Sequence, residues 1–428
     1  MVASSQAVAA GAGRRRPVWS KWPLAVALVV WCGFVGLATL PEFHAAARSR
    51  VPWMLSPLFH DWQVVRQGWE AWQRGVDPLA SADEPFNYPR SVLLGAQLGA
   101  GRVPLEVAGV MMAGMVLAAL VFLLRPEKRW QALMAVALVV SPPILLLLER
   151  ANLDAWALVL VIAGVAWFGR PNGGWAGRVG GSGLVLAAAL VKLFPFVAFA
   201  GLAWFGRGRG RLAAVAGLAL FALWLATSTG EIALILRKTT RGLEPAYGRM
   251  TAGSRYYVER VAPTVGRPEA EQWLREAMNA SLVGCVAAFA VAAVIGWKGR
   301  RRAALVPPRG PAAAWFVGGA LIYGGTFLLG SNWSYRLVFL LLCVPWLWRA
   351  WEVPAMRAWA GGGLGAVGVV LWAPFHLEFG WAMAREAVTW LLAAGLTGGA
   401  VAVLAGAADP ETPPPAGEDP ICAPGKPS

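Results

Sequence analysis

Residues 105–124 read LEVAGVMMAGMVLAALVFLL, a run in which Glu106 is the single charged side chain. An α-helix needs about 20 apolar residues to span the hydrocarbon core of a bilayer. Pro104 precedes the run and Arg125 follows it, so the apolar stretch is clearly bounded. The run therefore predicts a transmembrane helix, and comparable runs recur along the chain.

The composition points the same way. The 428-residue chain is 57% hydrophobic and 14% charged, whereas a soluble domain is about half apolar and about a quarter charged. It contains 24 Trp, a residue that favours the membrane–water interface. The net charge is +15, but the basic residues are scattered between the apolar runs, which favours a role in membrane orientation over nucleic-acid binding. We therefore expect an all-α integral membrane protein.

Ten runs have the character of membrane spans, and a further run, 180–205, has Lys192 and Pro195 in its middle. Because Pro breaks the helical hydrogen-bond ladder, we expect this run to form two half-helices of a re-entrant hairpin that enters and leaves from the cytoplasm. The ten predicted spans are 23–40, 105–124, 130–148, 153–169, 212–228, 281–297, 312–329, 337–348, 358–372 and 387–404.

Basic residues mark one side of this topology. Arg14, Arg15, Arg16 and Lys21 precede the first run, and short cytoplasmic loops carry an excess of Lys and Arg, so both termini are expected in the cytoplasm. A cleaved signal peptide is the alternative for the first run, which is long for a signal-peptide core. The predicted organisation is a cytoplasmic tail 1–22, a single transmembrane domain 23–405 with outer loops 41–104 and 230–280, and a disordered cytoplasmic tail 406–428.

The first outer loop holds several polar side chains. A carboxylate soon after the first span, such as Asp61, has the position of a general base at the outer membrane face. A solvated acid is the alternative, because most Asp side chains are exposed. Residues 64–72 predict a short amphipathic helix on the membrane surface. The loop contains His60-Asp61-Trp62, Gly75-Val76-Asp77-Pro78 and Phe86-Asn87-Tyr88-Pro89.

A second group, Glu149-Arg150-Ala151-Asn152-Leu153-Asp154, lies between two predicted spans. Ionisable residues near membrane depth are functional candidates by default. The structural alternative is an Arg–carboxylate pair that closes the turn, with Asn152 capping the next helix. The sequence leaves these two interpretations open.

Cations at other positions suggest an anionic ligand. Lys192 lies within an apolar segment and needs an anionic partner, which could be a lipid phosphate, Glu149 or Asp154; a snorkelling side chain is the alternative. The late outer turn contains Asn332, Tyr335 and Arg336, which could meet the first outer loop. The second outer loop is rich in Arg and Tyr, including Arg255. Arg suits phosphate recognition, although attraction to an anionic lipid surface would also explain it.

Other site types have little support in the sequence. The chain has three His and four Cys, without C-x-x-C spacing, a phosphate-binding G-x-x-x-x-G-K-[ST] loop, H-E-x-x-H or G-x-S-x-G. We therefore expect neither a metal site nor a cofactor.

Taken together, the motifs resemble the bacterial membrane glycosyltransferases of family 87, within the GT-C superfamily. The likeness extends from about Trp22 to Pro345 and is carried by the order of the motifs. They are an Asp in the first outer loop (Asp61), G-V-D-P at 75–78, F-N-Y-P at 86–89, E-R-A-N-L-D at 149–154, the K-x-x-P hairpin at 192–195 and S-N-W-S-Y-R at 331–336. Two positions depart from the family pattern: Arg90 replaces a usual second Pro, and Tyr335-Arg336 stands where many relatives carry a His.

The resemblance implies a GT-C-like bundle in the bacterial cytoplasmic membrane and an inverting hexosyl transfer from a polyprenyl-phosphate sugar, mannose or similar, to a glycan or lipid acceptor on the outer face. By the resemblance, Asp61 would be the base. Lys192, Arg255, Arg336 and Tyr335 would contact the donor phosphate. The expected substrate-contacting residues are Asp77, Asn87, Tyr88, Glu149, Arg150, Asn152, Asp154 and Asn332.

Two alternatives remain at this point. A transporter or flippase of a lipid-linked sugar should line a path through the midplane with polar residues, whereas here Lys192 alone lies deep and the other charges cluster outside. A non-catalytic scaffold for envelope assembly would leave the outer-loop acids dispensable.

Overall fold

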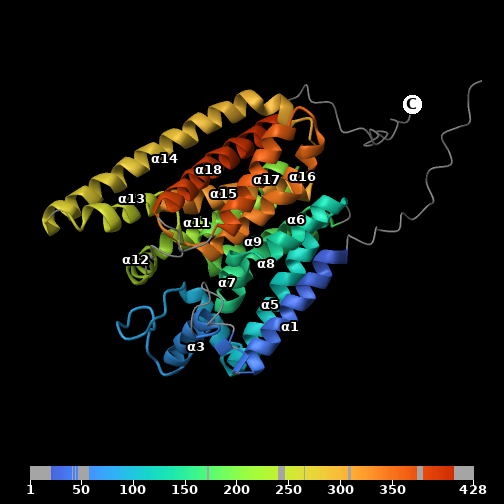
Figure 1. Ribbon diagram of the computed structural model, residues 1–428. Helices are drawn as coiled ribbons and strands as arrows, with labels where there is room; N and C mark the ends of the chain where they lie inside the picture. Colours follow the sequence, from blue (N-terminus) through green and yellow to red (C-terminus); the bar gives the residue numbers. More distant parts are fainter. Residues whose placement is uncertain are drawn as a thin grey trace, which may run out of the picture.

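The computed structural model describes residues 21–40, 42–43, 45–46, 57–170, 173–239, 246–264, 266–306, 310–373 and 379–408. Within these ranges the regular elements are helices, apart from two short strands, and turns and irregular segments such as residues 74–89 join them (Figure 1). Residues 1–20 of the predicted N-terminal tail and the C-terminal tail from 409 lie outside the described residues. The last helix reaches Ala408, three residues beyond the boundary predicted at 405.

The first half of the chain builds the part of the bundle that carries most of the polar motifs. The elements labelled η here are short 3₁₀ helices. In order, the elements are α1 (Trp22–Thr39), α3 (His60–Gln73), η2 (Arg90–Leu93), α4 (Leu94–Gln97), η3 (Ala100–Arg102), α5 (Leu105–Leu123), α6 (Arg129–Val139), α7 (Pro142–Arg150), α8 (Asp154–Phe168), α9 (Gly174–Val191), η4 (Phe194–Val197) and α10 (Ala198–Phe205).

The second half contributes the longest helices and both strands. Here η5 is a π-helical turn and η6 is a 3₁₀ helix. The elements are α11 (Arg209–Thr227), α12 (Thr229–Lys238), β1 (Ala246–Tyr247), α13 (Thr251–Tyr256), η5 (Tyr257–Val261), α14 (Arg267–Ala303), α15 (Pro311–Leu329), β2 (Asn332–Trp333), η6 (Ser334–Cys343), α16 (Val344–Glu352), α17 (Arg357–Trp372) and α18 (Phe379–Ala408).

Among the described residues, seven helices are long and apolar enough to cross a membrane, or eight if α6 and α7, bent by 44°, form one span. The seven are α1, α5, α9, α11, α14, α15 and α18. By length and composition, therefore, the chain is an all-α, multi-pass membrane protein. The count of ten stays a prediction, because α8 and α17 have only 15 and 16 residues.

Segment 174–205 forms a hairpin with unequal limbs. Its first limb, α9, is a full 18-residue helix and not the half-helix expected from 180. It packs closely along α8 through small residues, since a Cβ on Gly181 would lie 2.6 Å from the Gly164 carbonyl oxygen. After the break at Lys192, η4 and α10 run back, and a Cβ on Gly210 would lie 3.3 Å from Arg178 Cδ. Both ends of the hairpin therefore lie at the same end of the bundle.

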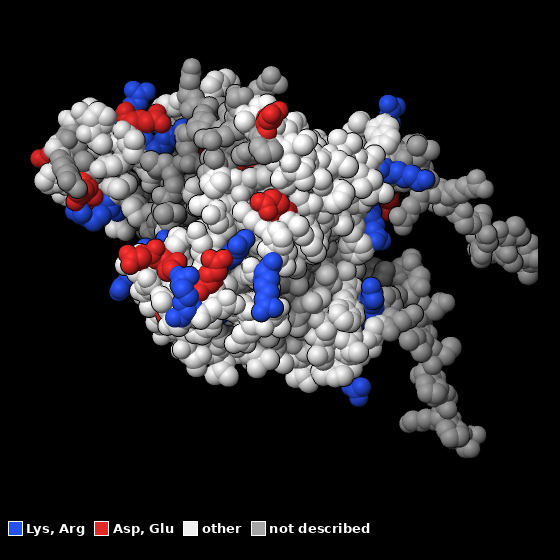
Figure 2. All heavy atoms as spheres, turned by 90° about the horizontal axis from the view of Figure 1, so that it is seen from below, with Lys and Arg blue, Asp and Glu red and all other residues white. Residues whose placement is uncertain are grey.

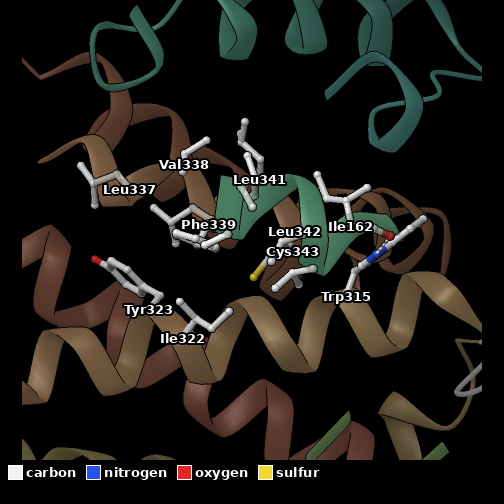
Figure 3. Close-up of a cluster of buried hydrophobic side chains, with 14 of the residues drawn as sticks. Ile162, Trp315, Ile322, Tyr323, Leu337, Val338, Phe339, Leu341, Leu342 and Cys343 are labelled. Carbon is white, nitrogen blue, oxygen red and sulfur yellow. Dashed lines mark hydrogen bonds between the residues drawn. The ribbon is translucent and has the colours of Figure 1, made fainter. Parts of the chain in front are cut away.

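The predicted span 337–348 is not one α-helix. It consists of η6 followed by α16, with Pro345 in the first turn of α16. Pro has no N–H to donate and is tolerated at a helix start. The side chains of η6, including Phe339 and Leu342, are buried with Ile322 of α15 in the apolar core (Figure 3). This buried arrangement holds the preceding late outer turn in place.

The two ends of the bundle differ in charge. At one end Lys128 pairs with Glu352, and a Cβ on Gly169 would lie 2.9 Å from Pro311 Cγ, so several interhelical loops meet there. Those loops and helix ends carry Arg125, Lys128, Arg129, Arg170, Arg178, Arg207, Arg209, Arg211, Lys298, Arg300, Arg301 and Arg302. The face seen from below Figure 1 instead carries acidic and basic groups intermixed (Figure 2), as in the ion pairs Arg66–Glu70 and Arg74–Glu84.

Candidate active site

The position of α3 is fixed by its first residues. Phe59 has a left-handed backbone (φ 58°), and its N–H donates to the Glu149 carbonyl oxygen at 2.7 Å. Its ring lies directly over Gly109 of α5, where a Cβ would come within 2.5 Å. Non-glycine residues in this conformation are strained and tend to occur at functional sites. The result is that Asp61, in the first turn of α3, faces Arg150 at the end of α7.

The predicted amphipathic helix in the first outer loop exists as α3, His60–Gln73. Its apolar side chains are buried within the protein, with Val65 fully buried and Trp69 only 4% exposed. The Trp69 indole N–H also donates to the Val92 carbonyl oxygen at 2.8 Å. At least this face of the helix therefore packs on the protein and not on lipid.

Asp61 is held from two sides. Its Oδ1 accepts hydrogen bonds from Arg150 Nη2 at 2.5 Å and Nε at 3.1 Å, and its Oδ2 accepts one from Asn152 Nδ2 at 2.5 Å. Its side chain is 12% exposed. A carboxylate has about four lone-pair positions, so these three bonds leave one to accept a further proton or hydrogen bond.

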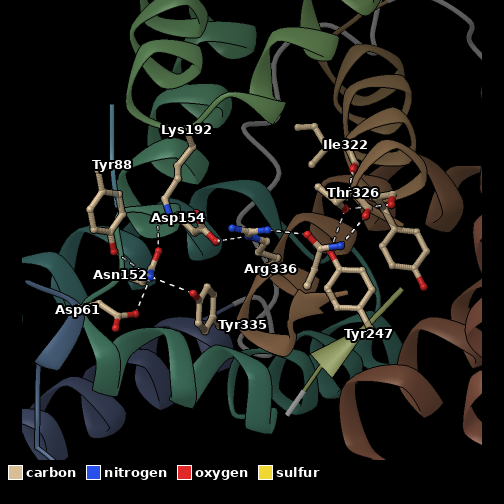
Figure 4. A network of polar contacts seen from close by, with 12 residues as sticks. Asp61, Tyr88, Asn152, Asp154, Lys192, Tyr247, Ile322, Thr326, Tyr335 and Arg336 are labelled. Atoms are coloured by element: carbon tan, nitrogen blue, oxygen red, sulfur yellow. Dashed lines mark hydrogen bonds and ion pairs between the residues drawn. The ribbon is translucent and has the colours of Figure 1, made fainter. Parts of the chain in front are cut away.

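Asn152 links the acid to the rest of the site (Figure 4). Its Nδ2 lies 3.1 Å from the Tyr335 hydroxyl and 3.4 Å from the Tyr88 hydroxyl, and its Oδ1 accepts the Asp154 N–H at 2.9 Å. The side chain thus satisfies a free amide at the start of α8, as the helix-capping interpretation expected, although Leu153 is the terminal residue. Ala151 before it is left-handed (φ 47°), which ends α7 and turns Asn152 inward. The capping role expected of Asn152 is therefore confirmed, whereas the functional interpretation of this motif stays a prediction.

Asp154 carries the second ion cluster. It is fully buried, with Lys192 Nζ 3.1 Å from Oδ1 and Arg336 Nε 3.1 Å from Oδ2. A buried charge requires such partners because desolvation is costly. Of the partners considered for Lys192, the structure therefore selects Asp154 and not Glu149. One carboxylate is shared by two cations, which leaves one positive charge beside it.

Aromatic rings support the two cations. Lys192 Nζ lies 4.5 Å from the centre of the Tyr88 ring, and Arg336 Cζ lies 5.3 Å from that of Phe194. Arg336 Nη1 also donates to Asn332 Oδ1 at 2.5 Å. The register of the two strands, which pair Tyr247 with Asn332, holds Asn332 in this position. Both cations are therefore fixed in direction before any ligand binds.

These groups surround a cavity of about 740 Å³, within the range of about 300–1,000 Å³ usual for ligand sites. The rest of its wall is largely apolar. Phe196, Leu236 and Leu329 line it and are 37%, 58% and 76% exposed at the molecular surface. Nine predicted site residues line the cavity: Asp61, Asn87, Tyr88, Arg150, Asn152, Lys192, Asn332, Tyr335 and Arg336.

Four predicted site residues do not line it. Asp154 lies behind the two cations, and Glu149 is buried in α7 at 3% exposure. Arg255, expected at the phosphate, is buried in α13 with an ion-pair contact to Glu259 at 3.7 Å. Its place in the second outer loop brings it to α13 and not to the cavity, so the structure gives no support to its predicted role.

The fourth, Asp77, serves a structural contact. It accepts a hydrogen bond from Arg90 Nη2 at 2.5 Å and one from the Leu79 N–H at 3.0 Å. Partial burial opposes these bonds, yet they hold the pKa of Asp77 below its ordinary value. Arg90 also contacts Glu231, whose carboxylate accepts the Arg90 backbone N–H at 2.7 Å. Arg90, noted only as a departure from the family pattern, thus joins the first outer loop to α12.

A second set of contacts holds the other end of α12. Lys238 Nζ donates to the carbonyl oxygens of Pro78, Ser81 and Glu84 at distances from 2.5 to 2.9 Å. Burial lowers the pKa of Lys238, against the opposing charges of Asp77 and Glu84. Lys238 also lines the cavity. From the sequence, Lys238 was grouped only with the other cations of the second outer loop that could meet a phosphate, and Glu231 was given no role.

His60 is a further residue that the sequence analysis did not assign. It lines the cavity beside Asp61, and its Nδ1 is buried without a hydrogen-bond partner among the described residues. Burial and the nearby Arg150 charge lower the pKa of His60, against the opposing effect of Asp61. We therefore expect a neutral imidazole at neutral pH.

In the part of the chain that the structure describes, no group of three or more His, Cys, Asp and Glu is placed to hold a metal ion. Comparisons of the chain with protein-family models, with curated proteins and with solved structures found no match. The motifs and the geometry of the cavity are therefore what bear on the function.

Proposed function

We propose that the chain is an inverting glycosyltransferase that moves a sugar, mannose or similar, from a polyprenyl-phosphate donor to a glycan or lipid acceptor. The observation that carries the proposal is one cavity holding three features. They are a partly accessible carboxylate at Asp61, two oriented cations at Lys192 and Arg336, and an apolar side lined by exposed Phe196, Leu236 and Leu329.

Each feature matches a need of the reaction. Asp61 takes the proton of the acceptor hydroxyl, whose oxygen attacks the anomeric carbon from the face opposite the phosphate. The bond from that carbon to the phosphate oxygen breaks, and the phosphate leaves with the electron pair. Because this oxygen gains negative charge in the transition state, preoriented cations nearby lower the barrier. Lys192 and Arg336 supply them, and the uncompensated positive charge beside Asp154 favours the dianionic product.

The apolar side of the cavity suits the donor's lipid. A polyprenyl chain can stay in the bilayer while its phosphate reaches Lys192, provided that the wall between them is apolar. The charge asymmetry supports the orientation we propose, with the basic end and both termini in the cytoplasm. Because the hairpin returns to its starting end and Gly210 lies against Arg178, the residues Arg207, Arg209 and Arg211 belong to the basic end, as the proposed orientation requires. On this orientation, the cavity opens at the outer face of a bacterial cytoplasmic membrane.

The test is sugar transfer by the purified full-length protein in lipid, with a panel of radiolabelled polyprenyl-phosphate sugars and membrane extracts as acceptor source. Wild type is compared with Asp61→Asn and with the control Asp83→Asn, since Asp83 is an exposed acid of the same loop. Transfer by wild type and by the control, with loss in Asp61→Asn, is the expected result. Equal transfer by all three would remove Asp61 from the mechanism.

The transporter alternative is separated in the same preparation. Liposomes carrying labelled lipid-linked sugar in one leaflet report its movement to the other. Movement without any transfer product would favour a flippase and overturn the proposed reaction.

A further inference from the structure

A second cavity, of about 580 Å³, lies at the basic end of the bundle. Its walls come from α5, α8 and α9, with Met115, Ile162 and Leu184 among the apolar lining residues. The cavity lies further along α8 than the polar site: Asp154 begins this helix, whereas the cavity is lined by α8 residues from Val159 to Trp167 and by Arg170 after the helix ends. At about 1.5 Å per residue, this lining lies about 8 to 20 Å along α8 from Asp154.

The rim of this cavity is basic and aromatic. Arg170 and Phe122 both line it, and Arg125 Cζ lies 4.2 Å from the centre of the Phe122 ring. Both Arg side chains are exposed, and neither makes an ion pair with a carboxylate of the described residues. Trp167, 41% exposed, also lines the cavity and is of the residue type that prefers the level of lipid headgroups.

We infer that this cavity binds an anionic phospholipid, with an acyl chain along the apolar wall and the headgroup phosphate at Arg125 and Arg170. Two observations favour this occupant. The apolar interior with a cationic rim matches the two parts of such a lipid, and the cavity lies where loops rich in Lys and Arg meet. Basic pockets between transmembrane helices are known to take anionic headgroups. The inference does not depend on the proposed reaction.

The test measures lipid binding by native mass spectrometry of the full-length protein released from detergent. Phosphatidylglycerol is compared with phosphatidylcholine, for wild type and for the double variant Arg125→Gln, Arg170→Gln. A juxtamembrane basic residue strengthens binding of anionic lipid by roughly fivefold, so the double variant should lose roughly twentyfold or more for phosphatidylglycerol. Phosphatidylcholine should be affected less.

The matched control is Arg207→Gln, Arg209→Gln, which removes two exposed charges from the same end without touching the cavity. It should retain most of the phosphatidylglycerol binding. Equal losses in both double variants would reduce the effect to general surface charge and overturn the inference.

A third variant tests the apolar wall. Ala163 lines the cavity, and Ala163→Trp should fill it while leaving both Arg residues in place. Lost phosphatidylglycerol binding is expected. Unchanged phosphatidylglycerol binding would show that the acyl chain does not occupy this cavity, and displacement of the lipid by millimolar inorganic phosphate alone would show that the Arg pair holds only the anion. Either result would overturn the inference. Circular dichroism melting confirms in each case that the variant is folded.

Discussion

Asp61 and Asp154 belong to the same polar network, yet their surroundings are opposite. Asp61 pairs with one cation, is 12% exposed and lines the cavity. Asp154 pairs with two cations, is fully buried and does not line it. The difference separates two roles for one residue type. An acid that can be reached can exchange a proton with a substrate, whereas an enclosed acid fixes the cations that face the substrate.

Of the predicted effects, the largest is that of Asp61→Asn on the rate of sugar transfer. Asp61→Asn should lower the rate of sugar transfer by about 10²- to 10⁴-fold, the usual contribution of a general base. The amide can still accept a bond from Arg150, so the fold should persist. The measurement is initial transfer rate at saturating donor, with melting temperature alongside. If the variant melts far below wild type, Asp61 has a structural role, and the proposed difference between Asp61 and Asp154 is wrong.

For the buried Asp154, we expect a substitution to lower the stability of the protein. Asp154→Asn leaves Lys192 and Arg336 without their carboxylate, and removing one partner of a buried pair costs about 3–5 kcal/mol. Thermal unfolding in detergent measures it. Adding Lys192→Met to this variant should restore part of the loss, because it removes one of the two unpaired cations. If Asp154→Asn is as stable as wild type, the buried carboxylate does not stabilise the fold, and the proposed difference in role between Asp154 and Asp61 is wrong.

Substitutions of Lys192 test whether a cation held by Asp154 contacts the donor phosphate. Charge-assisted hydrogen bonds contribute about 1.5–3 kcal/mol, so Lys192→Gln should lower kcat/KM for the donor by about 10- to 100-fold. Lys192→Arg, which keeps the charge, should retain a larger share of donor binding. Steady-state kinetics with varied donor give both values. If the two variants behave alike, the positive charge at this position is not what binds the phosphate.

The smallest expected effect concerns His60, next to Asp61 in α3. Its pKa is lowered in the folded protein, so the unfolded chain binds the additional proton more readily. Stability should therefore fall as the pH drops below about 6.5, the ordinary value for His, and stop falling once the folded form is also protonated. His60→Gln should flatten this part of the profile. Melting temperatures from pH 7.5 to 5 measure it, and identical slopes in variant and wild type would contradict the assignment.

The sequence predicted some parts of this molecule because they depend on local composition. Apolar runs identify most of the spans, and the Lys192–Pro195 spacing predicts the break of the hairpin. The polar motifs of the first outer loop, of the turn at 149–154 and of the late outer turn indicated Asp61, Asn152 and Arg336 as candidates, and the structure brings them to one cavity.

Other parts depend on contacts that no single sequence reveals. The Arg90–Glu231 contact joins residues 141 positions apart, and only the assembled outer loops bring them together. The close packing of α9 against α8 at Gly164 and Gly181 is likewise a contact between segments that only the folded chain shows. Arg255 is a residue type that often binds phosphate, but it lies buried in α13 and does not line the cavity. Residue type thus suggested chemistry, while tertiary packing decided which groups share the cavity.

The hairpin also fixes the parity of the topology. A segment that returns to its starting side adds either no crossing or two, so the even or odd count of crossings between α8 and α11 is the same as if they were consecutive spans. An odd number of crossings in the same place would reverse every later loop and would move α15 and the late outer turn to the opposite side from Asp61. The turn at Lys192 therefore keeps both halves of the chain in the same orientation across the membrane. Without it, the parts of the cavity contributed by residues 59–152 and 321–336 would lie on opposite sides.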